Sequence, residues 1–128
     1  MKRRRFITAS ALLGFTGFSF GMRPKKKQLL HHVFFWLKNP NSEVDKQELI
    51  SGLKTLEAIP VVRQIHIGLL ASTEPREVVD TSWQVSELLY FDNEVDQKIY
   101  QDHPIHQAFV KNYAHLWQKV VVYDMVEV

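Results

Sequence analysis

The stretch Leu29–Leu37 reads Leu-Leu-His-His-Val-Phe-Phe-Trp-Leu, and it decides how the rest of the chain folds. Apart from its two histidines, every residue is aliphatic or aromatic, a composition typical of a β-strand. Side chains alternate between the two faces of a strand. One face therefore carries His31, Val33, Phe35 and Leu37, and the other carries His32, Phe34 and Trp36. Because both faces are apolar, we expect other parts of the protein to cover both.

A helix follows this strand after the turn 39–42. Ser42 or Asn41 can cap the helix, because a short polar side chain accepts hydrogen bonds from the first free backbone N–H groups. Apolar residues then recur every three or four positions as far as Ile59, the spacing of an amphipathic helix. Pro60 ends it, since the residue before a proline avoids helical geometry.

Two more strands are predicted over 61–70 and 83–91, joined by a polar loop over 71–82. The second of these strands contains one acid in its middle, Glu87. A carboxyl group at such a position requires either a hydrogen-bonding partner or solvent.

The helical region that follows is interrupted at His103-Pro104. Asn93 lies at capping-box spacing from Asp96 and starts a short helix through about Tyr100. Pro104 suits the first turn of a new helix, where its missing N–H costs nothing. The stripe expected to face inward comprises Ile105, Ala108, Phe109, Asn112, Tyr113 and Leu116. A final strand is predicted over 120–128.

The predicted order is β-α-β-β-α-β, with the second helical part split in two. This is the α+β, ferredoxin-like arrangement: a four-stranded antiparallel sheet with helices on one face. Helices protect only one face of such a sheet, yet both faces of 29–37 are apolar. We therefore expect a second copy of the chain to cover the open face, giving a homodimer.

Charge is distributed unevenly along the 128 residues. Residues 1–27 hold eight of the sixteen Lys and Arg and no acid, so residues 28–128 have eight basic and fourteen acidic side chains, a net charge of −6. An acidic body argues against nucleic-acid binding, which needs a basic face. The sequence has no cysteine, which excludes disulfides, thiolate nucleophiles and cysteine-ligated metals.

The first 27 residues have the pattern of a signal peptide and a basic linker. A basic start is followed by the uncharged run 6–21, which is short for a membrane-spanning helix. Arg3-Arg4-Arg5-Phe6-Ile7 resembles a twin-arginine export signal. We expect an exported protein, located in the periplasm, with residues 28–128 as its one domain. The alternative is an uncleaved N-terminal membrane anchor.

The stretch 100–110 contains the residues best suited to chemistry. His106, one turn into the last helix, could act as a general base, and Tyr100 could hold a developing oxyanion. His31 could reach the same space, because its face of the strand should meet the helices. The alternative is that His106 and His31 only form hydrogen bonds with backbone groups in the core between helices and sheet.

The other histidines have simpler interpretations. His103 lies at a helix boundary, where it caps or packs, and His32 and His66 fall on the sheet face assigned to the dimer. Imidazole is a common metal ligand, but the histidine spacing matches no recognised metal motif, so no metal or other cofactor is predicted.

Several motifs extend through the folded body. They are His31-x-Val33-x-Phe35-x-Leu37-Lys38, Ile59-Pro60-Val61-Val62, Phe91, Tyr100-x-x-His103-Pro104-x-His106-x-x-Phe109 and Lys119-Val120-Val121-Val122-Tyr123-Asp124. Together they resemble the stress-responsive A/B barrel family, part of the dimeric α/β-barrel superfamily. The resemblance covers about 29–126 and implies a homodimer whose two sheets form a barrel.

Plant polyketide cyclases of this family close a poly-β-keto chain by aldol condensation without a cofactor. The resemblance implies that their catalytic tyrosine and histidine correspond to Tyr100 and His106, and their first-strand pocket histidine to His31. A further cyclase histidine on the third strand has no counterpart, because Gln84 or Val85 occupies that region.

Three functions are therefore considered. The first is an exported homodimer that binds a small organic ligand between helices and sheet. The second is a cofactor-free lyase or cyclase acting on a small keto or aromatic compound, with His106 as base and Tyr100 as oxyanion donor. The third and weaker one is a cofactor-independent monooxygenase, as in neighbouring branches of the superfamily. A cavity shared by Tyr100 and His106 would favour catalysis.

Overall fold

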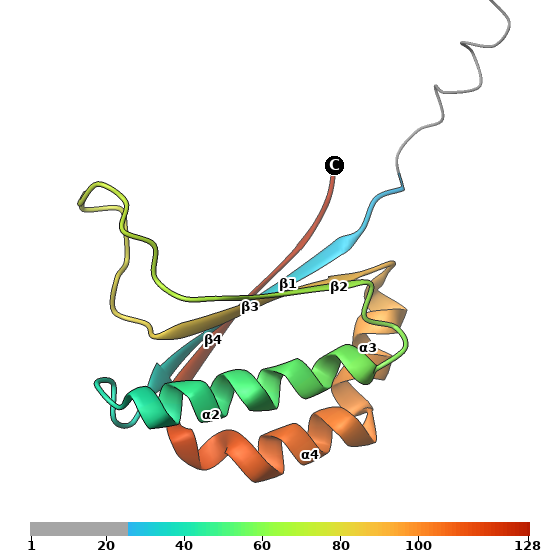
Figure 1. Cartoon of the computed structure of the whole chain (residues 1–128). Coiled ribbons are helices and arrows are strands. Elements are labelled where there is room, and N and C mark those ends of the chain that lie inside the picture. Colours follow the sequence, from blue (N-terminus) through green and yellow to red (C-terminus); the bar gives the residue numbers. More distant parts are fainter. Residues whose placement is uncertain (1–25) are drawn as a thin grey trace, which may run out of the picture.

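The computed structural model describes residues 26–128, which form one antiparallel sheet with helices against one of its faces (Figure 1). The predicted signal and the start of the basic linker lie outside the described residues. Within 26–128, no helix is long and apolar enough to cross a membrane.

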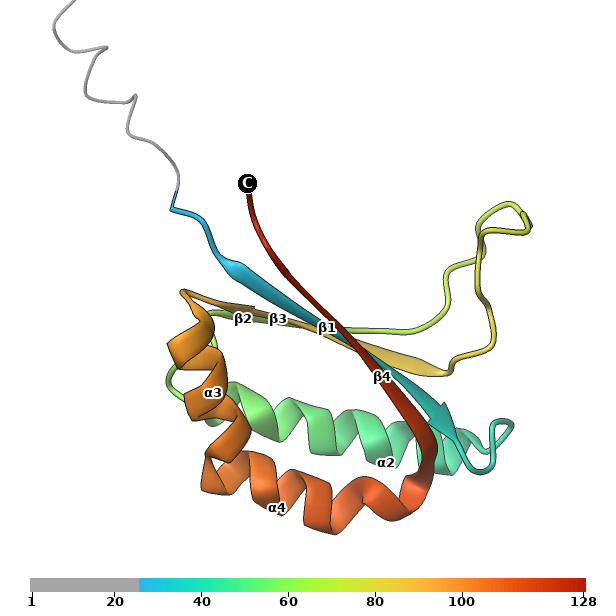
Figure 2. The same ribbon diagram turned by 180° about the vertical axis from the view of Figure 1, so that it is seen from behind.

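The elements follow the predicted order. They are β1 (Leu29–Leu37), α2 (Glu43–Lys54), the 3₁₀ turn η1 (Thr55–Ala58), β2 (Gln64–Gly68), β3 (Val85–Phe91), α3 (Glu94–Asp102), α4 (Pro104–Tyr113), the 3₁₀ turn η2 (Ala114–Leu116) and β4 (Trp117–Val126). The strands lie in the order β2-β3-β1-β4, and every neighbouring pair is antiparallel. The α+β ferredoxin-like fold with helices on one face is therefore confirmed (Figures 1 and 2).

The predicted helix starts are confirmed because their causes are local. The Ser42 side chain accepts a hydrogen bond from the N–H of Asp45, and Asn93 accepts one from the N–H of Asp96. His103 caps α4 by accepting from the N–H of Ile105. Its expected capping role is thus confirmed.

Three strands differ from prediction in their bounds. β2 is limited to five residues, because the turn after η1 occupies Val61 and Val62 and because this edge strand pairs only with β3. β3 begins at Val85 rather than at residue 83. β4 begins at Trp117, three residues early, because Trp117 pairs with the last residue of β1, Leu37.

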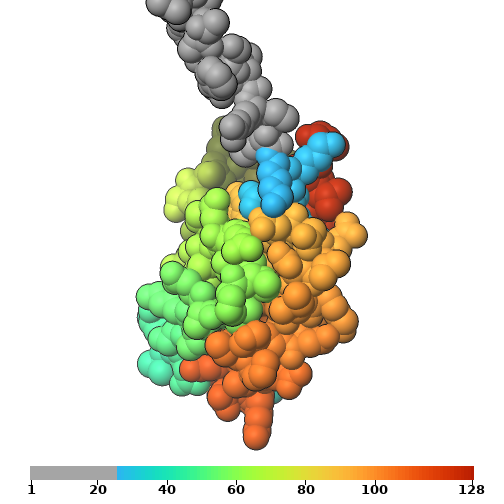
Figure 3. All heavy atoms as spheres, turned by 90° about the vertical axis from the view of Figure 1, so that its right-hand side faces the viewer, coloured from blue at the N-terminus to red at the C-terminus, as the bar shows by residue number. Residues whose placement is uncertain are grey.

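The core lies between the helices and the side of the sheet that carries Val33, Phe35 and Leu37. α2 and α4 pack closely there, as Figure 3 shows from the side. At their contact, a Cβ on Gly52 would lie 2.7 Å from the Tyr113 ring. Of the stripe predicted to face inward on α4, Phe109 is buried, but Ala108 and Asn112 are exposed.

The opposite face of the sheet has no helix over it in the described part of the chain and carries an aromatic cluster. Phe34 lies at the centre of this open-face cluster, and its ring contacts those of His32, Trp83 and Tyr123. Tyr123 leaves 65% of its surface exposed. This exposed aromatic face is the surface that a second copy of the chain was expected to cover.

Candidate functional site

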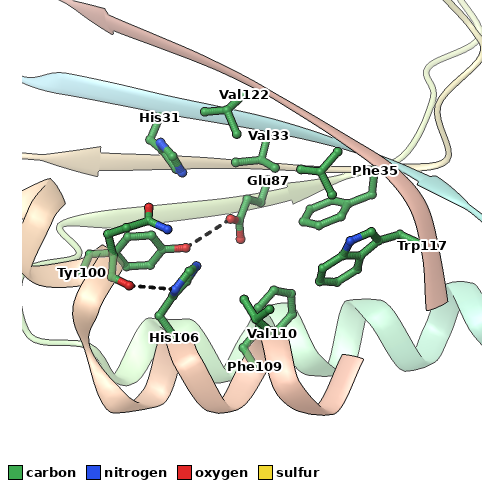
Figure 4. Close-up of a pocket in the computed structure, with 12 residues that line it drawn as sticks. His31, Val33, Phe35, Glu87, Tyr100, His106, Phe109, Val110, Trp117 and Val122 are labelled. Carbon is green, nitrogen blue, oxygen red and sulfur yellow. Dashed lines mark hydrogen bonds between the residues drawn. The ribbon is translucent and has the colours of Figure 1, made fainter. Parts of the chain in front are cut away.

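A cavity of about 190 Å³ lies between the helix-facing side of the sheet and α3 and α4 (Figure 4). Its walls are mainly apolar, with Phe35, Phe109 and Trp117 at one end. It opens along β4, where the lining residue Val122 is 44% exposed because no helix in 26–128 covers that edge strand. The polar groups gather at the other end.

The three predicted site residues meet at this polar end. His31, Tyr100 and His106 all line the cavity, although they come from β1, α3 and α4. The Tyr100 ring centre lies 5.8 Å from that of His31 and 4.7 Å from that of His106. The fold therefore brings together the residues that sequence reasoning singled out, in one shared cavity.

His106 is held by the break between α3 and α4. Its Nδ1 lies 3.1 Å from the backbone oxygen of Gln101, and a carbonyl oxygen can only accept, so Nδ1 carries the hydrogen. In a neutral ring Nε2 is then unprotonated, and in Figure 4 this nitrogen points toward Tyr100 and Glu87. Burial lowers the pKa of His106, although its bond to Gln101 opposes this, and His31 lowers that pKa further. A neutral imidazole with its lone pair facing a cavity is suited to take a proton.

His31 is positioned by Asp124, a residue that sequence reasoning did not assign to the site. The two residues are directly paired between β1 and β4, and His31 Nδ1 lies 2.5 Å from Asp124 Oδ1. His31 itself is buried, whereas the Asp124 side chain is half exposed. Since a carboxylate can only accept, Nδ1 donates this bond, and in a neutral ring Nε2 would be the acceptor.

Glu87 is the second site residue that sequence reasoning missed. It lies on β3, paired with Val33 on one side and Ile67 on the other, and is only 2% exposed. Its Oε1 accepts a long hydrogen bond of 3.4 Å from the Tyr100 hydroxyl. Its Oε2 has no hydrogen-bond partner among residues 26–128. Alternation along the strand could have revealed this position, because Glu87 shares its face with the core residues Val85, Leu89 and Phe91.

Burial dominates the ionisation of the Glu87–Tyr100 pair. Loss of solvent raises the pKa of Glu87 to about 8 from 4.5, and the bond from Tyr100 opposes this only in part. Burial also raises the pKa of the Tyr100 phenol, and the neighbouring carboxyl raises it further. Near pH 7 the polar end of the cavity therefore holds a carboxylic acid, a phenol and a neutral His106.

The remaining expected positions have structural roles. Gln84 accepts a hydrogen bond from the N–H of Leu37, and Val85 is fully buried in the core. Neither side chain therefore takes the place of the histidine that the plant cyclases carry on the third strand. His32 and His66 lie on the open face, but each is paired with Leu88, so β3 separates them. No group of three or more His, Asp or Glu that could hold a metal occurs in 26–128.

A family model described as "Stress responsive A/B Barrel Domain" matches residues 29–127. The chain belongs to the stress-responsive A/B barrel domain family. Among curated proteins, no significant match is found. Members and neighbours of the A/B barrel family do occur among solved structures.

Three of these structures illustrate the A/B barrel neighbours. A dimeric protein of unknown function and ferredoxin-like fold from Bacteroides fragilis is 28% identical, with a TM-score of 0.59, covering 77% of this chain and 94% of that one. A dabb family protein with a ferredoxin-like fold from Mesorhizobium loti is 23% identical, with a TM-score of 0.65 and coverage of 80% and 98%. A hydroxynitrile lyase from Passiflora edulis is 18% identical, with a TM-score of 0.66 and coverage of 81% and 96%.

Proposed function

We propose that this A/B barrel protein binds a small organic ligand in the cavity between helices and sheet. The observation that supports this is the convergence of His31, Glu87, Tyr100 and His106 on one end of an otherwise apolar space. A few polar groups in an apolar pocket are the usual form of a small-molecule site. At about 190 Å³ the cavity is smaller than the roughly 300–1,000 Å³ of pockets for drug-sized ligands, so the ligand is small.

The functional unit in this proposal is a homodimer formed through the open sheet face. The aromatic cluster around Phe34 supports it, and so does the similarity to the Bacteroides fragilis protein, which is described as dimeric. Sedimentation equilibrium tests it, with twice the chain mass expected. Phe34→Asp should convert the dimer to monomer, whereas Val44→Asp, on an exposed helix surface, should leave it intact. A wild-type protein that sediments only as monomer would overturn the dimer.

A second candidate function is cofactor-free proton-transfer catalysis, as in a lyase or cyclase acting on a keto or aromatic compound. The specific observation in its favour is that the Tyr100 hydroxyl and His106 share the cavity. In the proposed step, His106 Nε2 takes a proton from the carbon beside a carbonyl. The C–H electron pair forms a C=C bond, and the carbonyl π pair moves to oxygen, where Tyr100 stabilises the negative charge.

Hydrogen exchange tests this chemistry without knowledge of the natural substrate. Acetophenone has an acidic methyl group beside its carbonyl, so an enzyme of this kind should exchange that methyl group in D₂O. NMR should show exchange above the buffer rate with wild-type protein, near the buffer rate with His106→Gln and at a reduced rate with Tyr100→Phe. Equal exchange by all three proteins would refute the assigned roles, and no exchange above buffer would leave only the binding function.

We also propose that the protein is exported through its twin-arginine-like leader. Arg4 belongs to both possible arginine pairs in Arg3-Arg4-Arg5, so Arg4→Lys should reduce export while keeping the charge. Arg23→Lys in the linker is the matched control. A reporter fused after residue 27 would reveal the location, and export unaffected by Arg4→Lys would contradict the signal type.

A further inference from the structure

Glu87 is the strongest unexplained feature of the cavity. A glutamate occurs on an inner strand of the sheet, 2% exposed, where the neighbouring positions on the same face are Val85 and Leu89. Buried polar groups in proteins nearly always have hydrogen-bond partners. Yet Oε2 of Glu87 has none within residues 26–128. The proposed roles of His106 and Tyr100 do not explain why an acid is kept here.

The direction of Oε2 indicates where a hydrogen-bond partner for this atom could lie. In Figure 4, Oε1 is turned toward the Tyr100 hydroxyl, while the other carboxyl oxygen points away from β3 into the space above His106 and Val110. This space is the cavity itself, which Glu87, His106 and Val110 all line. The unsatisfied atom therefore lies in the wall of the cavity that a ligand would occupy, with less than 1 Å² of its own surface exposed.

The neighbours of Glu87 favour its neutral form. The groups that face it are Tyr100 from α3, His106 from α4 and His31 from β1, which is itself bonded to Asp124 of β4. None of the described residues lining the cavity is Lys or Arg, so no permanent cation is available to pair with a carboxylate. The raised pKa of about 8 agrees with this geometry. Tyr100 donates to Oε1, so the acid's own hydrogen is placed on Oε2.

We propose that Glu87 is a neutral carboxylic acid whose Oε2–H donates a hydrogen bond to the carbonyl oxygen of an uncharged, mainly apolar ligand. The inference rests on the small-ligand function proposed above and specifies the chemical class of the ligand. A carboxylate ligand would bring a second acidic group into a cavity without a lysine or arginine, which is unfavourable at low dielectric. An aliphatic or aromatic ketone, by contrast, offers an acceptor for Oε2–H and an apolar remainder for Phe35, Phe109 and Trp117.

Under this proposal Tyr100 has a different role from that of the oxyanion donor in the proton-transfer step above. Its hydroxyl is directed to Glu87 Oε1, so it orients the acid, and the acid is the group that meets the ligand oxygen. The proton-transfer candidate is unchanged at His106, whose unprotonated nitrogen faces the same space.

Two variants separate the features of Glu87. Glu87→Gln keeps the shape and an N–H donor but cannot ionise, whereas Glu87→Met keeps similar length and removes the donor. Two probes separate the features of the ligand, because acetophenone carries a carbonyl and ethylbenzene has nearly the same shape without one. Binding can be followed by NMR shifts, with tryptophan fluorescence as a second measurement, since Trp117 lines the cavity.

The expected results are specific to the carbonyl. Wild-type protein should bind acetophenone below about pH 8 and more weakly above it, while Glu87→Gln should bind it equally across this range. Glu87→Met should lose about tenfold in affinity for acetophenone and little for ethylbenzene. Without any ligand, the infrared difference between wild type and Glu87→Gln near pH 6 should contain the C=O stretch of a protonated carboxyl group.

Each contrary result has a distinct meaning. No protonated-carboxyl band, or tighter binding of benzylammonium than of acetophenone, would show an ionised Glu87 and overturn the inference while leaving the small-ligand function intact. If Glu87→Met lost the same affinity for acetophenone and for ethylbenzene, Glu87 would have only a structural role. A wild-type protein that binds neither probe refutes the ligand class, and the infrared band still decides whether Glu87 is neutral.

Discussion

Replacing Glu87 by glutamine is expected to stabilise the protein at neutral pH, although it alters a fully buried residue. In the folded protein the pKa of Glu87 is about 8, against an ordinary value of 4.5. A carboxyl group whose pKa is raised by folding favours the folded state most below pH 4.5. This contribution is then lost as the pH rises to about 8, because the unfolded chain ionises first. Glutamine does not ionise, so the stability of Glu87→Gln does not fall over this pH range for that reason.

The size of the effect follows from the two pKa values. Each unit of pKa difference corresponds to about 1.36 kcal/mol. Between about pH 5 and about pH 7, the wild type should therefore lose on the order of 3 kcal/mol of unfolding free energy relative to Glu87→Gln. This is a large part of the roughly 5–15 kcal/mol that stabilises a typical domain.

Urea denaturation of both proteins at fixed protein concentration, over a series of pH values, measures this difference. A fixed concentration is needed because the proposed dimerisation would add its own contribution to stability. Glu74→Gln, which removes an acid from the exposed loop between β2 and β3, is the control and should follow the wild-type curve. Parallel pH curves for wild type and Glu87→Gln would refute a neutral, buried Glu87.

Three further predictions concern the packing and the histidines. Gly52→Ala should destabilise the fold by about 1–3 kcal/mol in thermal or urea unfolding, because the new Cβ would overlap the Tyr113 ring; an unchanged midpoint would contradict this contact. Asp124→Ala should remove the hydrogen bond that fixes the ring of His31. The loss of unfolding free energy should be about 1 kcal/mol or less, because Asp124 is half exposed. ¹⁵N NMR of the variant should show a mixture of His31 ring tautomers in place of one. If His106 is the base, acetophenone exchange should stay constant from neutral pH down to 6.5 and fall only below it, because burial lowers the pKa of the ring; a fall that begins above 6.5 would argue against it.

The parts of the fold that sequence could predict are those with local causes. The bounds of β1 follow from nine consecutive apolar and histidine residues, and the caps at Ser42, Asn93 and His103 depend on atoms at most three residues away. The end of β2 was predicted less well, because an edge strand ends where its one neighbour stops pairing with it.

The site was predictable only in part for a related reason. Tyr100 and His106 are close in sequence, and a single helix break brings them together. The contact between His31 and Asp124 depends on the register of β4 against β1, across 93 residues, and no sequence pattern determines that register. The Glu87–Tyr100 pair likewise depends on how α3 packs on β3.

The junction at His103-Pro104 has a consequence for how this protein family could diversify. Tyr100 lies near the end of one helix and His106 near the start of the next, so two different helices carry the phenol and the imidazole. A change in the length or composition of the junction would move these groups relative to each other while the core contacts of α2, β1 and β3 stayed as they are. New ligand preferences could then evolve through the joint between two helices, without the loss of stability that usually accompanies mutation of a buried pocket.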